Sequence, residues 1–130
     1  MTMEQKPRLR LLDAQLDVHK LASVMQLEDL QGNWFLSSTD EELSLVCESL
    51  NRELIKDSVQ KSELNWRSIK VEGPLDFEMT GVIAGLSQEL AKAEIPIFVV
   101  STFDTDYVLI KERNLAEALV VLKKAGYVFV

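Results

Sequence analysis

The sequence predicts an α+β fold in which two similar small units pack together as one body. Three observations predict it: strand and helix patterns alternate along the chain, one polar turn motif occurs twice, and the composition supports a core. Of the 130 residues, 47% are hydrophobic and 27% are charged, the proportions of a soluble globular protein. A chain of this length forms one ordinary domain or two very small ones.

The first half of the chain is expected to contain strands but no long helix. Residues 8–21 alternate or run apolar, as in a strand and its continuation. A short helical or irregular connector over 22–33 leads to strands that begin at Trp34 and Leu43, with a polar turn between them. Residues 49–61 show only a weak helical pattern.

The second half has a clearer pattern. Thr80 stands where a helix N-cap is expected, and Gly126 where a helix should stop. The expected elements are a strand over 66–71, a helix over 81–93, strands over 95–100 and 107–110, a helix over 114–124 and a strand over 127–130. This order is that of the split βαβ, ferredoxin-like arrangement, whose helices cover one face of an antiparallel sheet.

The two predicted hairpins resemble each other in sequence. Phe35–Thr39 matches Phe98–Thr102 and, once Phe103 is skipped, the acidic turn and the apolar strand that follow match as well. An internal repeat usually marks one supersecondary unit used twice. We therefore expect a first unit over 1–65, shortened because it lacks a long helix, and a second over 66–130. Neither has much core alone, so the two should pack together.

Two stretches carry a resemblance to a known family. "SSTDEELSLVCE" over 37–48 and "STFDTDYVLIKE" over 101–112 resemble the small bacterial proteins built from two ACT-type domains, and the CASTOR arginine sensors share this signature. The resemblance covers residues 34–130. It implies a regulatory fold that binds amino acids or similar small molecules and acts by changing how ACT units pair.

An amino-acid ligand needs a partner for its carboxylate. The N-terminus of a helix provides one, because its free N–H groups and its dipole favour an anion. Residues 75–83 are predicted to form such a terminus, with Phe77, Thr80, Gly81 and Val82 as candidate ligand-binding residues. Gly81 would let a ligand or a neighbouring chain come close; alternatively, it only eases the packing of the helix on the sheet.

The ligand's ammonium group needs a carboxylate, which Asp104 or Asp106 could provide. Asp also favours turns because its side chain bonds nearby backbone groups, so both acids could be turn residues only. Both hairpins carry acids here, and the resemblance places this strand end beside the turn before the first helix. We therefore predict that Asp104 or Asp106 pairs with an ammonium or guanidinium group, with Ser44, Ser101 and Thr102 as polar lining.

Other classes of function are not favoured. His19 is the only histidine, Cys47 the only cysteine, and the five glycines are spread singly, so we expect no catalytic pair, metal site, phosphate loop or cofactor. The net charge of −7 argues against nucleic-acid binding. No apolar run approaches the roughly 20 residues that span a bilayer, so we expect no membrane partner and a cytoplasmic location.

These observations lead to a functional hypothesis. The protein is expected to be a non-catalytic regulatory module that binds an amino acid or a related zwitterion and acts through ligand-dependent association, as a homodimer or larger homo-oligomer. The alternative is a ligand-free module that uses the same faces for homodimerisation or for docking a partner enzyme. A pocket between the units would favour the first hypothesis, and a filled apolar junction the second.

Overall fold

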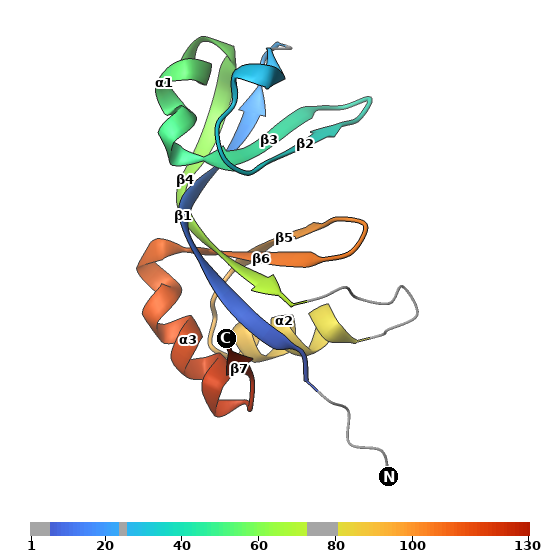
Figure 1. The fold of residues 1–130 in the computed structure, drawn as a ribbon, viewed down its shortest axis with the longest axis vertical. Coiled ribbons are helices and arrows are strands. Elements are labelled where there is room, and N and C mark those ends of the chain that lie inside the picture. The colour runs from blue at the N-terminus through green and yellow to red at the C-terminus, as the bar shows by residue number, and fades with distance from the viewer. Residues whose placement is uncertain (1–5, 24–25, 73–80) are drawn as a thin grey trace. The chain divides into compact units, whose positions relative to one another are not determined.

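The structure is a computed structural model that describes residues 6–23, 26–72 and 81–130 (Figure 1). Its contacts divide the chain into two compact units: unit 1 comprises Met1–Asp13 and Arg67–Val130, and unit 2 comprises Ala14–Trp66. Two long strands, β1 (Arg8–Leu21) and β4 (Val59–Val71), run through both units. Each unit thus contains part of β1 and part of β4. The predicted division into a first unit over 1–65 and a second over 66–130 stays a prediction.

Unit 2 is a ferredoxin-like unit that lacks its first long helix. Its sheet has the order β2-β3-β1-β4. The elements between β1 and β4 are η1 (Leu27–Asp29), β2 (Trp34–Ser38), β3 (Leu43–Glu48), η2 (Ser49–Asn51), α1 (Arg52–Ile55) and η3 (Lys56–Ser58). In the described residues of the connector from β1 to β2, the one helical element is the 3-10 turn η1, where the sequence pattern showed no long helix, so the first half is trimmed as predicted.

Unit 1 has the complete strand, helix, strand, strand, helix, strand order that the second half of the sequence predicts. After β4 come α2 (Val82–Lys92), β5 (Ile97–Ser101), β6 (Asp106–Lys111), η4 (Glu112–Asn114), α3 (Leu115–Lys124) and β7 (Val128–Phe129). Its sheet runs β1-β4-β6-β5, and β7 pairs with β1 in parallel, with Arg8 opposite Val128. The predicted α+β, ferredoxin-like fold class is confirmed.

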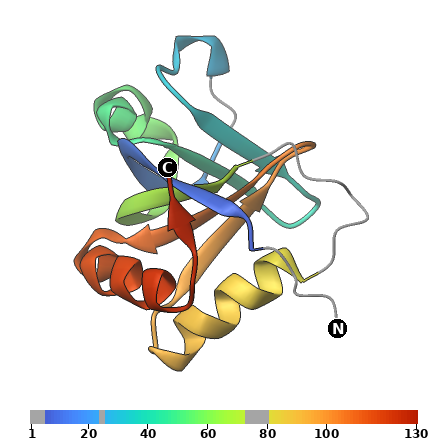
Figure 2. The ribbon, with the colours of Figure 1, turned by 60° about the horizontal axis from the view of Figure 1, so that its bottom comes forward.

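The core of unit 1 lies between its sheet and its two helices. Leu86 and Leu90 of α2 and Leu122 of α3 are buried together with Ile69 of β4 and Ile110 of β6. Figure 2 shows α2 and α3 lying across one face of the sheet of this unit. Their apolar residues repeat at helical spacing, and the helices are stable because this stripe is buried.

Two helix ends predicted from the sequence can be compared with the structure. Gly81 stands at the N-cap position of α2 with a left-handed backbone (φ 79°) and accepts a hydrogen bond from the Gly85 amide at 2.8 Å. Thr80, the predicted cap, lies outside the described residues. Asn114 occupies the N-cap position of α3, although its side chain makes no capping bond.

The two hairpins have the same register, at a constant offset of 63 residues. Phe35 lies opposite Val46 in one, and Phe98 lies opposite Leu109 in the other. Each turn has four residues, closed by Thr39 N–H to the Glu42 carbonyl at 3.0 Å and by Thr102 N–H to the Thr105 carbonyl at 2.8 Å.

The sequence match that skipped Phe103 is therefore wrong by one residue from the turn onward. Asp106 corresponds to Leu43, and Glu41 to Asp104. Aligning acid with acid was misleading because turn length and strand pairing, and not the composition of the turn, set hairpin register. The strands that follow support the corrected register, because β3 and β6 have the same order of buried and partly buried residues.

Candidate ligand site at the hairpin edge of unit 1

The turn between β5 and β6 is closed by a threonine and not by its aspartates. The Thr102 hydroxyl donates to the Thr105 carbonyl at 3.1 Å, beside the amide bond from Thr102 to the same oxygen. Ser101 and Asp106 face each other as the last paired residues of the two strands. Thr39 closes the other hairpin in the same way, since its hydroxyl donates to the Glu42 carbonyl at 3.3 Å.

Asp104 and Asp106 are therefore not required to build this turn. Asp104 is exposed and Asp106 half-buried. Neither carboxylate forms a hydrogen bond or an ion pair with a residue that the structure describes. Turn-stabilising aspartates normally accept bonds from the backbone just after them, so the interpretation of both acids as turn residues lacks the contacts that it requires.

The start of α2 provides the second feature of this site. Gly81 has a φ of 79°, and a Cβ built on it would meet nothing within 4 Å. The glycine is therefore needed for its backbone conformation and not for close helix–sheet packing. Val82 follows and packs partly against the core of unit 1. The first N–H groups of a helix have no partner within the helix, so this end can receive an anion.

The topology of unit 1 brings these two features to one end of its sheet. β4, α2 and β5 form a strand–helix–strand crossover. The two strands therefore run in the same direction, and their C-terminal ends lie at the same end of the strands in the sheet. The β5–β6 turn and the start of α2 therefore lie on the same side of unit 1, as Figures 1 and 2 show. We call this side, with Gly81, Val82, Ser101, Thr102, Asp104 and Asp106, the hairpin edge. Phe77, another predicted site residue, lies outside the described residues.

Ser44 belongs to unit 2 and occupies a different environment. It lies in β3 between Ser37 of β2 and Lys20 of β1, and its hydroxyl donates to the Glu42 carboxylate at 3.3 Å. The corresponding residue of unit 1, 63 positions later, is Tyr107. The role of Ser44 as a lining residue stays a prediction.

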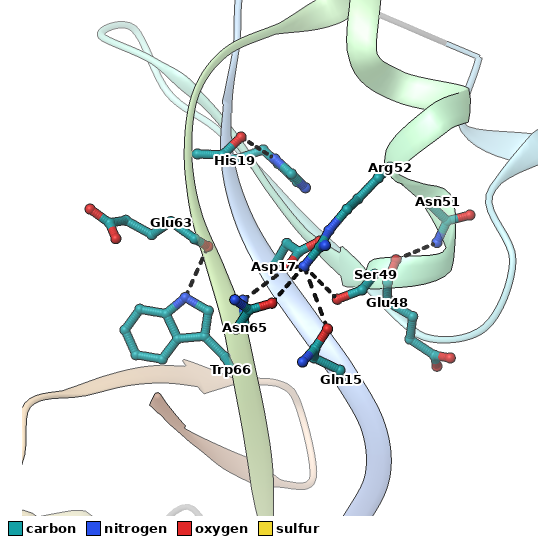
Figure 3. Close-up of polar contacts among 11 residues, drawn as sticks. Gln15, Asp17, His19, Glu48, Ser49, Asn51, Arg52, Glu63, Asn65 and Trp66 are labelled. Carbon is teal, nitrogen blue, oxygen red and sulfur yellow. Dashed lines mark hydrogen bonds and ion pairs between the residues drawn. The ribbon is translucent and has the colours of Figure 1, made fainter. Parts of the chain in front are cut away.

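Unit 2 contains a buried ion pair that the sequence analysis did not predict. The Asp17 side chain is fully buried, and its two oxygens accept bonds from Arg52 Nε at 2.7 Å and Arg52 Nη2 at 2.8 Å (Figure 3). The Asn65 amide donates to the same carboxylate at 3.0 Å. Burial alone would raise the pKa of Asp17, but these bonds, a bond from Ser49 and the Arg52 charge hold that pKa below its ordinary value.

This ion pair fixes an irregular place in β4. Asn65 has a left-handed backbone (φ 68°), and its side-chain oxygen accepts a third bond from Arg52 at 2.8 Å. The only signal in the sequence was an aspartate inside the apolar run around Leu16. Its partners lie 35 and 48 residues further along the chain, too far for a local pattern to reveal them.

His19 and Cys47 are both buried in unit 2. His19 Nδ1 lies 2.7 Å from the Ser62 hydroxyl, and burial lowers the pKa of the imidazole. Burial, with smaller effects from Asp17 and Glu48, raises the pKa of the Cys47 thiol to about 11, so it stays protonated and a poor nucleophile. Among the described residues, no three His, Cys, Asp or Glu side chains group as metal ligands.

The fold defines the class of the protein: a small α+β protein with the ferredoxin-like fold. Residues 61–124 match the family model of the ACT domain, which confirms the predicted resemblance. The match includes β4, α2, the β5–β6 hairpin and α3, and with them the hairpin edge.

Sequence relatives include the cytosolic arginine sensor for mTORC1 subunit 1 of Homo sapiens and of Mus musculus. The chain is 33% identical to the human protein and 30% identical to the mouse protein over 60 residues, which is 45% of this chain and 18% of each relative. The chain thus spans less than a fifth of the length of these curated relatives.

Solved structures extend the likeness to nearly the whole chain. Protein Atu0741 of Agobacterium tumefaciens is 28% identical with a TM-score of 0.83, over 98% of this chain and 94% of that one. The regulatory subunit of aspartate kinase from Thermus thermophilus has the same fold at 9% identity, with a TM-score of 0.62 over 91% and 96% of the two chains. No helix in the described residues is long and apolar enough to cross a membrane.

Proposed function

We propose that the protein is a non-catalytic regulatory module that binds an amino acid or a similar small zwitterion at the hairpin edge. One observation supports this most strongly: two aspartates that the turn does not need lie on the same side of unit 1 as a helix N-terminus. A zwitterion carries both charges that such an arrangement can bind, a cation for the carboxylates and an anion for the helix.

Each end of the ligand would meet a different chemistry. Asp104 or Asp106 would accept charged hydrogen bonds from its ammonium or guanidinium group, with Ser101 as a polar neighbour. The N–H groups that follow Gly81 would receive its carboxylate, with Phe77 and Thr80 as further candidates. Arginine is a reasonable first ligand to test, because the relatives matched over 60 residues are named as arginine sensors.

Ligand binding would act through association, with a homodimer as the expected minimum. The strand β5 lies at one end of the sheet order, and an edge strand presents unpaired N–H and C=O groups beside the turn that carries the aspartates. A ligand at this turn could therefore alter how β5 meets a second copy. We also propose that the two units derive from one repeated hairpin unit, which the constant offset of 63 residues supports, and that the protein is cytoplasmic.

A thermal-shift screen with the twenty amino acids tests this function. A ligand present at a hundred times its dissociation constant adds about 2.7 kcal/mol of stability. Light scattering with and without the stabilising compound then measures association. If the protein associates strongly and no amino acid stabilises it, the ligand-free interaction module is the better description.

A further inference from the structure

One face of unit 2 leaves large apolar side chains uncovered. Trp34 and Leu36 of β2 lie directly opposite Cys47 and Leu45 of β3, so they point to the same side of the sheet as these two core residues. Cys47 and Leu45 are fully buried, but Trp34 is 38% exposed and Leu36 is 36% exposed. The core of unit 2 therefore ends before it reaches its edge strand.

In unit 1 the position that corresponds to Trp34 is covered by the core. Ile97 of β5 corresponds to Trp34 at the offset of 63 residues. It packs against the core of unit 1, to which α2 contributes Leu86 and Leu90. In unit 2 the part of this connection that the structure describes has η1 as its helical element, and its three residues cannot replace a helix of eleven. The uncovered face thus corresponds to the place of an amphipathic helix.

The negative charge around this face favours a helix with basic residues. Unit 2 has ten acidic and four basic residues, and so carries six of the seven net negative charges of the chain. Exposed acids occur at both ends of β2: Glu28 and Asp29 in the connector before it, and Asp40, Glu41 and Glu42 in the turn after it. A partner with basic residues beside its apolar stripe would complement this charge.

The approach to β2 is also held in place. The Asn51 side chain makes hydrogen bonds to both the amide and the carbonyl of Gln31, each at 2.9 Å. The Glu48 carboxylate accepts a bond from the Asn33 amide at 2.7 Å. Because these bonds fix the connector where it enters β2, binding would cost little ordering of this segment.

We propose that the Trp34–Leu36 face of unit 2 binds an amphipathic, basic helix of a partner protein in the position that α2 holds in unit 1. Trp34 and Leu36 contact the apolar stripe of this helix. The acids of the connector and of the β2–β3 turn attract its basic residues. This is recognition of an amphipathic helix by an apolar face, with Trp34 as the aromatic anchor.

A synthetic peptide tests the proposal. The probe is an 18-residue peptide of Leu and Lys with Leu at helical spacing, and its matched control has the same composition in scrambled order. Binding is measured by anisotropy of the labelled peptide and by the emission of Trp34, with Trp34→Phe as the spectral reference. We expect saturable binding of the helical peptide, a blue shift that Trp34→Phe abolishes, and at least tenfold weaker binding of the scrambled peptide.

Variants of the protein locate the binding. Leu36→Lys should weaken binding at least tenfold, whereas Val120→Lys, the same kind of change at a 52% exposed residue of α3, should change it less than twofold. Circular dichroism checks that both variants are folded, and Trp34→Ser replaces Leu36→Lys if that variant is not. Asp40→Asn with Glu41→Gln should weaken binding and reduce its salt dependence, and Glu117→Gln should not.

Three results would overturn the proposal. Equal binding to the parent and to Leu36→Lys would show only charge attraction. Tighter binding of an extended peptide with alternating Leu and Lys would assign this surface to strand pairing at the edge of β2. Self-association that shields Trp34 from a soluble quencher at the same concentrations would assign it to a second copy of the chain.

Discussion

The two units differ in what supports the same hairpin. Unit 1 covers its strands with α2 and α3, and its core includes Leu86, Leu90 and Leu122. In unit 2 the described part of the connection after β1 contains a 3-10 turn in place of α2; the core is smaller, with Leu45 and Ile55, and an ion pair joins the buried Asp17 to Arg52. The comparison indicates that hairpin register does not depend on the first helix, since unit 2 keeps the same register with a smaller apolar core and an ion pair.

The largest effect is expected when the helix packing of unit 1 is broken. Leu90→Ala removes a fully buried side chain and should lower the free energy of unfolding by about 2–5 kcal/mol. Leu54→Ala, at a 51% exposed residue of α1, is the control and should change it by less than about 0.5 kcal/mol. Urea unfolding measures both, and equal losses would contradict the packing described for unit 1.

The ion pair of unit 2 should have the next largest effect. Asp17→Asn leaves Arg52 without its charged partner and should cost about 2–3 kcal/mol, less than a fully buried pair because the Arg52 side chain is 43% exposed. Hydrogen exchange should show the loss of protection in β1 and β3. Asp57→Asn, at an exposed acid of the same unit, is the control. Protection lost equally from α3 would show that the two units unfold together.

Acid should destabilise unit 2 through two groups. The folded-state pKa of His19 lies below 6.5, so the unfolded chain binds its proton first, and stability is lost as the pH falls from about 6.5 through the folded pKa. The pKa of Asp17 is also lower in the folded state, so stability is lost again as the pH falls from 3.8, its ordinary pKa, through the folded-state pKa. Each group gives a slope of at most about 1.4 kcal/mol per pH unit. Stability curves of the parent and His19→Gln should differ between pH 6.5 and 5, with the variant flatter.

Two glycines with similar backbones should tolerate alanine differently. Gly32 of unit 2 has φ 70°, and a Cβ there would clash with the Glu48 carboxyl group, whereas Gly81 of unit 1 has open space around it. Gly81→Ala should cost about 1 kcal/mol for its backbone alone, and Gly32→Ala about 2 kcal/mol because Glu48 must also move. Equal shifts in urea midpoint would show that Glu48 moves freely.

The smallest effect on folding is expected at the hairpin edge. Asp104→Asn and Asp106→Asn should change stability by less than about 0.5 kcal/mol, because neither side chain supports the turn. One of them should reduce the affinity for the ligand found in the screen by about 1.5–3 kcal/mol, the value of a charged hydrogen bond. Calorimetric titration measures this loss. If both variants bind like the parent and only Gly81→Val fails, recognition lies at the helix terminus alone.

The sequence allowed the strands and helices of unit 1 to be predicted because each is bounded by a strong local signal, such as Gly126 after α3. The hairpin acids were also visible, although their match between the halves was wrong by one residue. What could not be predicted depends on distant contacts. Asp17 gave no hint of Arg52 or Asn65, and the apolar pattern of Trp34 and Leu36 did not show that their side chains stay partly exposed.

The strands shared by the units also affect the order in which the protein can fold during synthesis. Unit 2 needs only residues 14–66, so its contacts can form while most of unit 1 is still untranslated. Unit 1 pairs Arg8 of β1 with Val128 of β7, and it cannot complete its sheet until residue 128 has left the ribosome. Such distant pairing is slow. A nascent chain can pair the first half of β1 with β4 soon after residue 72, but the start of β1 lacks β7 until synthesis reaches residue 128, and chaperones have reason to bind it in that interval.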